Sequence, residues 1–166
     1  MGARGINLAE DGHPISILSP QSISGGLTSI FFNLKTAAKA NILLQLGALA
    51  AAPGAVTLLA ASSAAGAGAV AIPFTYYQQP TAGNVNDTLA QNGGPSTAFA
   101  ATAAGFVPAD AANTFYVIEV QSDQLPAGLP YLALSIADGT NADFASALAI
   151  LTGLDYPGST QPTATT

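Results

Sequence analysis

The sequence predicts an all-β protein, specifically an antiparallel β-sandwich of the jelly-roll kind. From Ile15 onward, apolar residues recur mainly at a spacing of two, which is the period of a strand with one buried face. These apolar runs are short, and turn-favouring residues such as glycine and proline separate them. The order of elements lacks the strand-helix alternation that builds a parallel sheet, so antiparallel pairing is expected.

The chain is expected to form one domain, because 166 residues is an ordinary size for a single hydrophobic core. Residues 27–155 are the predicted body. Residues 1–26 mix glycine, proline and serine with little periodicity, so they are predicted to form an extended N-terminal arm. Residues 156–166 have too little apolar surface to fold alone and are predicted to form a C-terminal tail.

The first half of the body supplies four predicted strands. Residues 27–34 and 41–47 each alternate apolar side chains, and the polar, alanine-containing segment 35–40 is expected to connect them. Residues 55–61 and 69–77 follow, and the serines and glycines between them favour a loop.

Proline and a long polar segment follow at the middle of the chain. Pro73 cannot donate a ladder hydrogen bond, so its strand is expected to lie at a sheet edge or to bend there. Residues 78–96 are predicted to be a loop that contains at most one short strand, around Thr88 to Gln91.

The second half supplies four more predicted strands, and one of them is ambiguous. Phe144, Leu148 and Leu151 also lie at helical spacing, and alanine favours helices, so a helix competes with a strand there. The alternation of apolar residues favours the strand. A helix also competes over residues 62–72, where Gly66 and Gly68 weaken it. The four predicted strands are residues 97–102, 114–121, 131–136 and 142–152.

Strand parity selects the residues of the predicted core, which lie on one face of each apolar run. They are Ile30, Phe32, Ile42, Leu44, Leu46, Val56, Leu58, Ile118, Val120, Leu132 and Leu134.

Composition excludes several classes of partner. Only 7% of residues are charged, the net charge is −6, and three scattered cations leave no basic patch for nucleic acid. Residues 41–72 are the most apolar stretch, but Gln45 and Pro53-Gly54 interrupt it, so no membrane span is expected. A surface of Ala, Ser, Thr, Asn and Gln repels neighbours little and suits a protein that packs against other subunits.

One histidine, His13, could take part in chemistry. Glu10 and Asp11 lie beside it, which could indicate a metal site or an acid-base pair. A glycine-rich terminal segment gives these residues no rigid support, and catalytic zinc sites usually need more than one imidazole. A solvated turn is the favoured interpretation, and no metal is expected.

The carboxylates do not form a predicted catalytic pair. Glu119 lies inside a strand, on the face opposite Tyr116 and Ile118, where solvent or a subunit contact is favoured over catalysis. No nucleophile motif is present, so neither a catalytic residue nor a cofactor is expected, and the protein is predicted not to be an enzyme. The remaining candidates lie in predicted turns, where aspartate caps its own backbone: Asp110, Asp123, Asp138, Asp143 and Asp155.

The order of strands and turns resembles a family of small virion proteins of tailed bacteriophages, the head decoration or cement proteins. The similarity covers roughly residues 15–165. The segments that carry it most clearly are "FNLK", "AVTLL", "FTYY", "YVIEV" and "AILTGLDYPG".

The resemblance implies a structural role without catalysis. It implies that the protein binds the assembled major capsid protein and neighbouring copies of itself on the outer surface of the capsid, after synthesis in the host cytoplasm. We expect the arm to make much of the attachment, and the candidate contact residues are Arg4, Ile6, Leu8, Ile15, Ile17 and Glu119.

Two alternative functions stay open from the sequence. The first is a head-tail or tail component of the virion. The second is a carbohydrate-binding module, for which "FTYYQQ" is the only aromatic cluster available, although core packing of Phe74 and Tyr76 is favoured.

Overall fold

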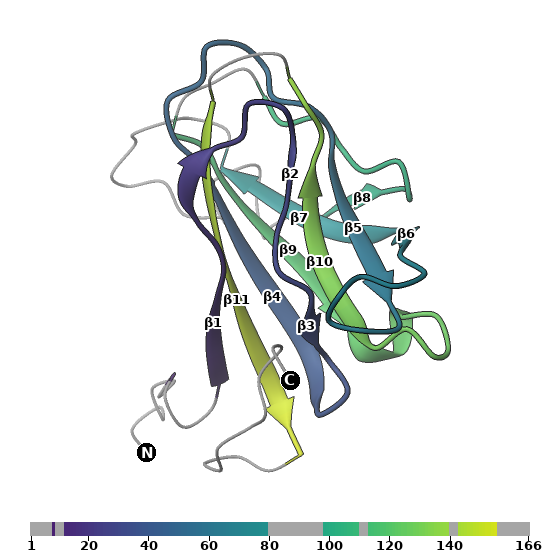
Figure 1. Cartoon of the computed structure of the whole chain (residues 1–166). Helices are drawn as coiled ribbons and strands as arrows, with labels where there is room; N and C mark the ends of the chain where they lie inside the picture. The colour runs from purple at the N-terminus through teal and green to yellow at the C-terminus, as the bar shows by residue number, and fades with distance from the viewer. Residues whose placement is uncertain (1–7, 9–11, 80–97, 110–112, 140–142, 156–166) are drawn as a thin grey trace, which may run out of the picture.

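The structure is a computed structural model that describes Leu8 and residues 12–79, 98–109, 113–139 and 143–155. Its strands form two antiparallel sheets packed face to face (Figure 1). The predicted all-β sandwich is therefore confirmed. Within the described residues, no helix has the length and apolar character needed to cross a membrane.

The larger sheet has six strands, and its three longest strands lie next to one another. Each of these three has ten or eleven residues, so this side of the sandwich is a broad and regular surface. In spatial order the strands are β1 (Gly12–Ser22), β11 (Phe144–Leu154), β4 (Ala37–Leu46), β9 (Phe115–Gln121), β7 (Phe74–Gln79) and β8 (Phe99–Ala101).

The smaller sheet has β10 near its centre. A short 3-10 helix, η1 (Ser122–Gln124), begins the connection from β9 in the larger sheet to β10 in the smaller sheet. The strands of this sheet are β2 (Leu27–Thr28), β3 (Phe32–Asn33), β10 (Tyr131–Ile136), β5 (Val56–Ala61) and β6 (Val70–Ile72).

The core lies between the two sheets and contains all of the predicted residues except Ile30. Alternation explains this agreement, because side chains of one parity along a strand all point to the same sheet face. Tyr116 is the largest fully buried side chain, and its hydroxyl accepts a hydrogen bond from the amide of Ala109 at 3.0 Å.

The prediction for Ile30 is wrong, because this residue is 43% exposed. Thr28 pairs with Ser135 and Asn33 pairs with Tyr131, so five steps along this segment match four steps along β10. One extra residue is therefore inserted, as in a β-bulge, and the insertion reverses which parity faces inward. Ser29 is buried in its place, with 6% exposed.

The predicted boundary between arm and body at residue 26 is also wrong. Residues 12–22 form β1, which pairs with β11 along its length, and Ile17, Leu18 and Ile23 belong to the core. Periodicity failed to identify this strand because two register shifts interrupt its alternation. Residues 1–7, 9–11 and the tail 156–166 lie outside the described residues.

The turn predictions have mixed outcomes. Pro73 separates β6 from β7, and the chain passes there from one sheet to the other, so the predicted bend is confirmed. Residues 62–68 form the predicted loop, and residues 144–154 form a strand rather than a helix. The segment 35–40 is only partly a connection, because β4 begins at Ala37. The strand suggested within residues 88–91 lies outside the described residues.

Candidate functional site

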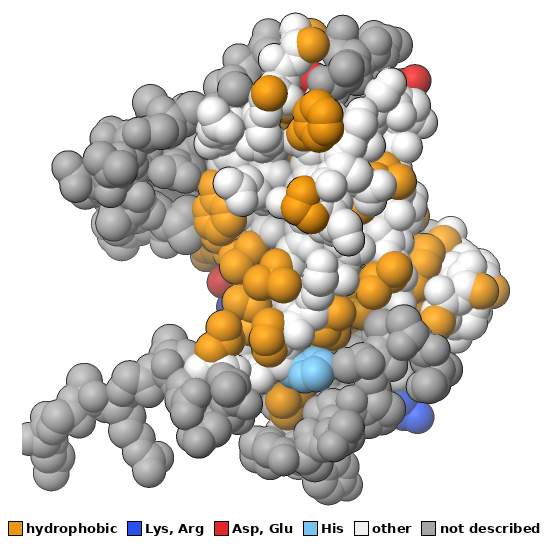
Figure 2. Space-filling model, turned by 60° about the vertical axis from the view of Figure 1, so that its left-hand side comes forward, with side chains coloured by type: hydrophobic (Ala, Val, Ile, Leu, Met, Phe, Trp, Pro, Cys, Tyr) orange, Lys and Arg blue, Asp and Glu red, His pale blue; other side chains and the backbone are white. Residues whose placement is uncertain are grey.

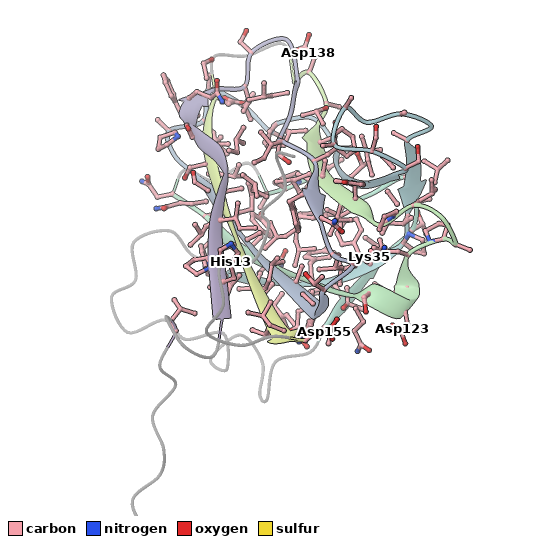
Figure 3. All side chains as sticks on the ribbon, turned by 60° about the horizontal axis from the view of Figure 1, so that its bottom comes forward. His13, Lys35, Asp123, Asp138 and Asp155 are labelled. Carbon is pink, nitrogen blue, oxygen red and sulfur yellow. The ribbon has the colours of Figure 1, made fainter. Side chains whose placement is uncertain are left out.

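The described carboxylates are dispersed, and two of them accept hydrogen bonds from backbone amides that are distant in the sequence, rather than from their own turn. Asp143 is 1% exposed and accepts a hydrogen bond from the amide of Ala50 at 2.7 Å, which ties two loops together. Asp138 accepts from the amide of Gly25 at 3.1 Å. Figure 3 shows Asp138 and Asp155 at opposite ends of the sandwich. In the described ranges no three His, Cys, Asp or Glu side chains gather in a way that could hold a metal ion.

His13 does not lie in a solvated turn, so that interpretation is wrong. It is part of β1, opposite Leu151, and its Nε2 is buried without a hydrogen-bond partner in the described part of the protein. Pairing with β11 fixes the backbone at His13. A turn was predicted because glycine and proline flank this residue. Glu10, Asp11 and Asp110 lie outside the described residues.

Glu119 makes an ion pair on the outward side of the larger sheet. Its Oε1 lies 2.9 Å from Nζ of Lys39 on the neighbouring strand, and about a third of each side chain is exposed. The parity predicted for Glu119 is correct, because Tyr116, Ile118 and Val120 point into the core. A pair this exposed contributes only ~0–1 kcal/mol to stability.

The predicted contact residues of the arm do not form one exposed surface. Leu8 is 41% exposed, Ile15 is partly buried against the core, and Ile17 is 2% exposed. Ile17 is a core residue, so its prediction as a contact residue is wrong. Arg4 and Ile6 lie outside the described residues.

The edge strand β1 is a poor template for an added strand. Pro14 has no amide hydrogen to donate, and register shifts between Ser16 and Leu18 and between Leu18 and Gln21 disturb the strand. The carbonyl of Ile17 already accepts a hydrogen bond from the amide of Ile30 at 3.2 Å. Attachment through backbone pairing at this edge is therefore disfavoured.

The aromatic cluster packs within the protein. The ring of Tyr76 stacks on Phe106, with centroids 3.9 Å apart, and on Phe99 at 5.4 Å. Phe74 is 3% exposed. Burial, with a smaller contribution from Tyr116, raises the pKa of Tyr76 above its ordinary value. These contacts leave Tyr76 engaged with other rings instead of open as a platform for a sugar.

A hollow of about 540 Å³ lies at one end of the sandwich. The connection from β9 to β10 forms much of it, including Pro126 and Pro130, and Leu34 and Lys35 contribute from the turn before β4. It contains one amine and two serine hydroxyls, Ser62 and Ser122, which do not amount to a catalytic arrangement.

The outward side of the six-stranded sheet carries a row of apolar side chains between rows that also contain Asn41, Gln45 and Ser146. Strand register places Leu148 beside Leu43, Leu43 beside Val117, and Val117 beside Tyr77, in one row across four strands. Ile150 and Phe115 lie in the adjacent rows, and all six are partly exposed. We call these six residues the outer face. Figure 2 shows hydrophobic side chains gathered on the side of the molecule that β1 borders, near the pale-blue His13.

On this side of the sheet the sequence had indicated only Glu119 as a possible subunit contact, and no contact was predicted for the apolar residues near it. The signal was present in "LAIL", which is apolar at both parities, and in Leu43. Comparison with protein family models, curated proteins and solved structures finds no match for this chain.

Proposed function

We propose that this chain is a structural protein of a tailed-bacteriophage particle that binds the assembled lattice of major capsid protein and stabilises the head. The resemblance of its strand order to head decoration proteins suggests this class. A two-sheet body with broad surfaces of low charge supports the proposal, because it suits binding to another protein better than catalysis.

The observation that supports the proposal most is the scarcity of charge over the whole chain, in which only 7% of residues are charged. Within the described residues, Lys39 and Glu119 also neutralise each other. Burial of apolar surface gives about 25 cal/mol per Å², so a few hundred Å² can hold a subunit without ion pairs.

Stabilisation of the head would follow from mass action. A protein that binds only the assembled shell lowers the free energy of that state by RT ln(1 + [L]/Kd) at each site. Many modest contacts then add up over the lattice without a chemical reaction.

Cosedimentation tests the proposal. The full chain is mixed with expanded empty heads of the phage that encodes it and, in parallel, with unassembled capsid subunits. We expect the chain to pellet with the heads and not to bind the subunits. Equal binding to both, or binding to neither, would contradict a role that depends on the lattice.

The same preparation separates the alternatives. Binding to isolated tails or necks but not to heads would support a tail component. Retention on an array of bacterial glycans without binding to heads would support a carbohydrate-binding module.

A further inference from the structure

The outer face is an apolar feature of the described surface that packing of the core does not explain. A strand of an antiparallel sheet normally alternates buried apolar residues with solvated polar ones. On β4, β9 and β11 the outward positions include Leu43, Val117, Leu148 and Ile150. An apolar patch of this kind marks an interaction site on a soluble protein.

We propose that the outer face packs against the same face of a second copy, so that the chain forms a two-fold dimer with its larger sheets in contact. This inference does not rest on the proposed function, because it concerns the isolated protein.

The whole outward side of the larger sheet is large enough for a dimer contact, with the outer face at its centre and polar residues such as Asn41, Gln45 and Ser146 around it. Five adjacent strands, β1, β11, β4, β9 and β7, at a spacing of ~4.8 Å and seven residues long at ~3.4 Å per residue span roughly 24 Å by 24 Å. That is close to 600 Å² from each copy, near the lower end of the ~1,200–2,000 Å² that specific interfaces bury in total.

The distribution of charge favours a second copy over other partners. The chain has a net charge of −6, which opposes self-association, but the outer face is bordered by one cation and one anion that already pair. Asp138 and Asp155 lie at the ends of the sandwich, away from this contact (Figure 3). The apolar row offers no counter-charge to a charged partner. A second outer face carries no charge in that row, so it needs no counter-charge.

The shape of the face also suits its own copy. Two twisted sheets pack face to face at an angle of about 30° and interdigitate their side chains. A hollow of about 260 Å³ beside the outer face is lined partly by Leu43, Phe115 and Leu148. Phe144, which is 51% exposed, lies on the same side of β11 and can act as a knob for such a hollow. A two-fold contact uses such a knob and hollow twice.

Sedimentation equilibrium or light scattering after gel filtration measures the proposed dimer. At about 100 µM the full chain should have twice its monomer mass of 16.4 kDa. Leu43→Lys should return the mass to that of a monomer or raise the dissociation constant at least ~10-fold, because it places two like charges in the contact.

Leu59→Lys is the matched control. Leu59 is also a partly buried leucine on an outward strand position, but on the smaller sheet, opposite Ala133 and Ala71. It should leave the dimer intact. Phe144→Ser provides a second variant at an exposed position that does not disturb the core, and it should weaken association at least ~10-fold.

Circular dichroism confirms that each variant keeps its strand content before its mass is interpreted. A wild-type chain that stays monomeric at about 100 µM would overturn the proposal. So would a dimer that Leu59→Lys disrupts while folded Leu43→Lys or Phe144→Ser leaves it unchanged.

Discussion

Ser29 offers a direct test of how the bulge between β2 and β3 is held. Its Oγ accepts a hydrogen bond from the amide of Leu134 at 2.9 Å, and its own amide donates to the carbonyl of Leu134 at 2.8 Å. The extra residue of the bulge removes a backbone acceptor from β10, and the serine hydroxyl replaces it. Leu134 is 1% exposed and Ser29 is 6% exposed, so solvent has little access to this amide.

Ser29→Ala should therefore destabilise the protein by about 2 kcal/mol, within the ~1–3 kcal/mol cost of leaving a buried donor without an acceptor. For a domain of this size that corresponds to a fall in Tm of roughly 4–8 °C. With an m-value near 2 kcal/mol/M, the urea midpoint should fall by about 1 M with little change in slope.

Thr28→Ala is the control for this prediction. Its hydroxyl pairs with that of Ser135 at 2.9 Å, but this bond is open to solvent, so water can replace it and the expected change is within ~0.5 kcal/mol. Urea unfolding followed by far-ultraviolet circular dichroism gives both values. Equal midpoints for the two variants would refute the idea that the Ser29 hydroxyl replaces a missing ladder acceptor.

Three further predictions concern other parts of the core and surface. Tyr116→Phe removes the acceptor of the Ala109 amide and should cost ~0.5–1.5 kcal/mol by urea unfolding, whereas no loss would mean that the bond is replaced by water. The pKa of the Tyr76 hydroxyl is higher in the folded protein than in the unfolded chain, so the stability that Tyr76 contributes is complete below the unfolded-state pKa and is lost as pH rises through the folded-state pKa. Unfolding midpoints should therefore fall above about pH 10, and they should fall less steeply in Tyr76→Phe. Since the Lys39 and Glu119 side chains are each about a third exposed, raising salt from ~0.05 to ~0.5 M should change stability by less than ~1 kcal/mol, and a larger loss would assign that pair a greater role.

The regular strands could be predicted because their side chains alternate between a buried and a less buried face. Ile42, Leu44 and Leu46 on β4 and Ile118 and Val120 on β9 were identified by parity alone. This reasoning depends only on period, so it holds wherever the ladder is uninterrupted.

Interruptions of the ladder could not be predicted by the same reasoning. Because of the bulge after Thr28, Ser29 is buried in the core where Ile30 was predicted. Two register shifts interrupt the alternation of β1, so this strand was predicted to be part of an arm. Such insertions depend on which partner strand lies alongside, and that information is not local in the sequence.

The candidate site was predicted least well, because sheet faces are assembled from strands far apart in the chain. Leu43, Val117 and Leu148 become neighbours only through the pairing of β4 with β9 and β11. Single residues such as Ile17 and Glu119 were chosen from local context, and only Glu119 faces outward.

The proposal that the chain belongs to the head of a phage particle is tested most directly by electron cryomicroscopy of intact particles from the phage that encodes it. We expect density for a two-sheet body at repeated positions on the outer surface of the capsid lattice, with the six-stranded sheet placed by rigid fitting. Particles that contain the chain only at the neck or tail, or that lack it altogether, would contradict the account.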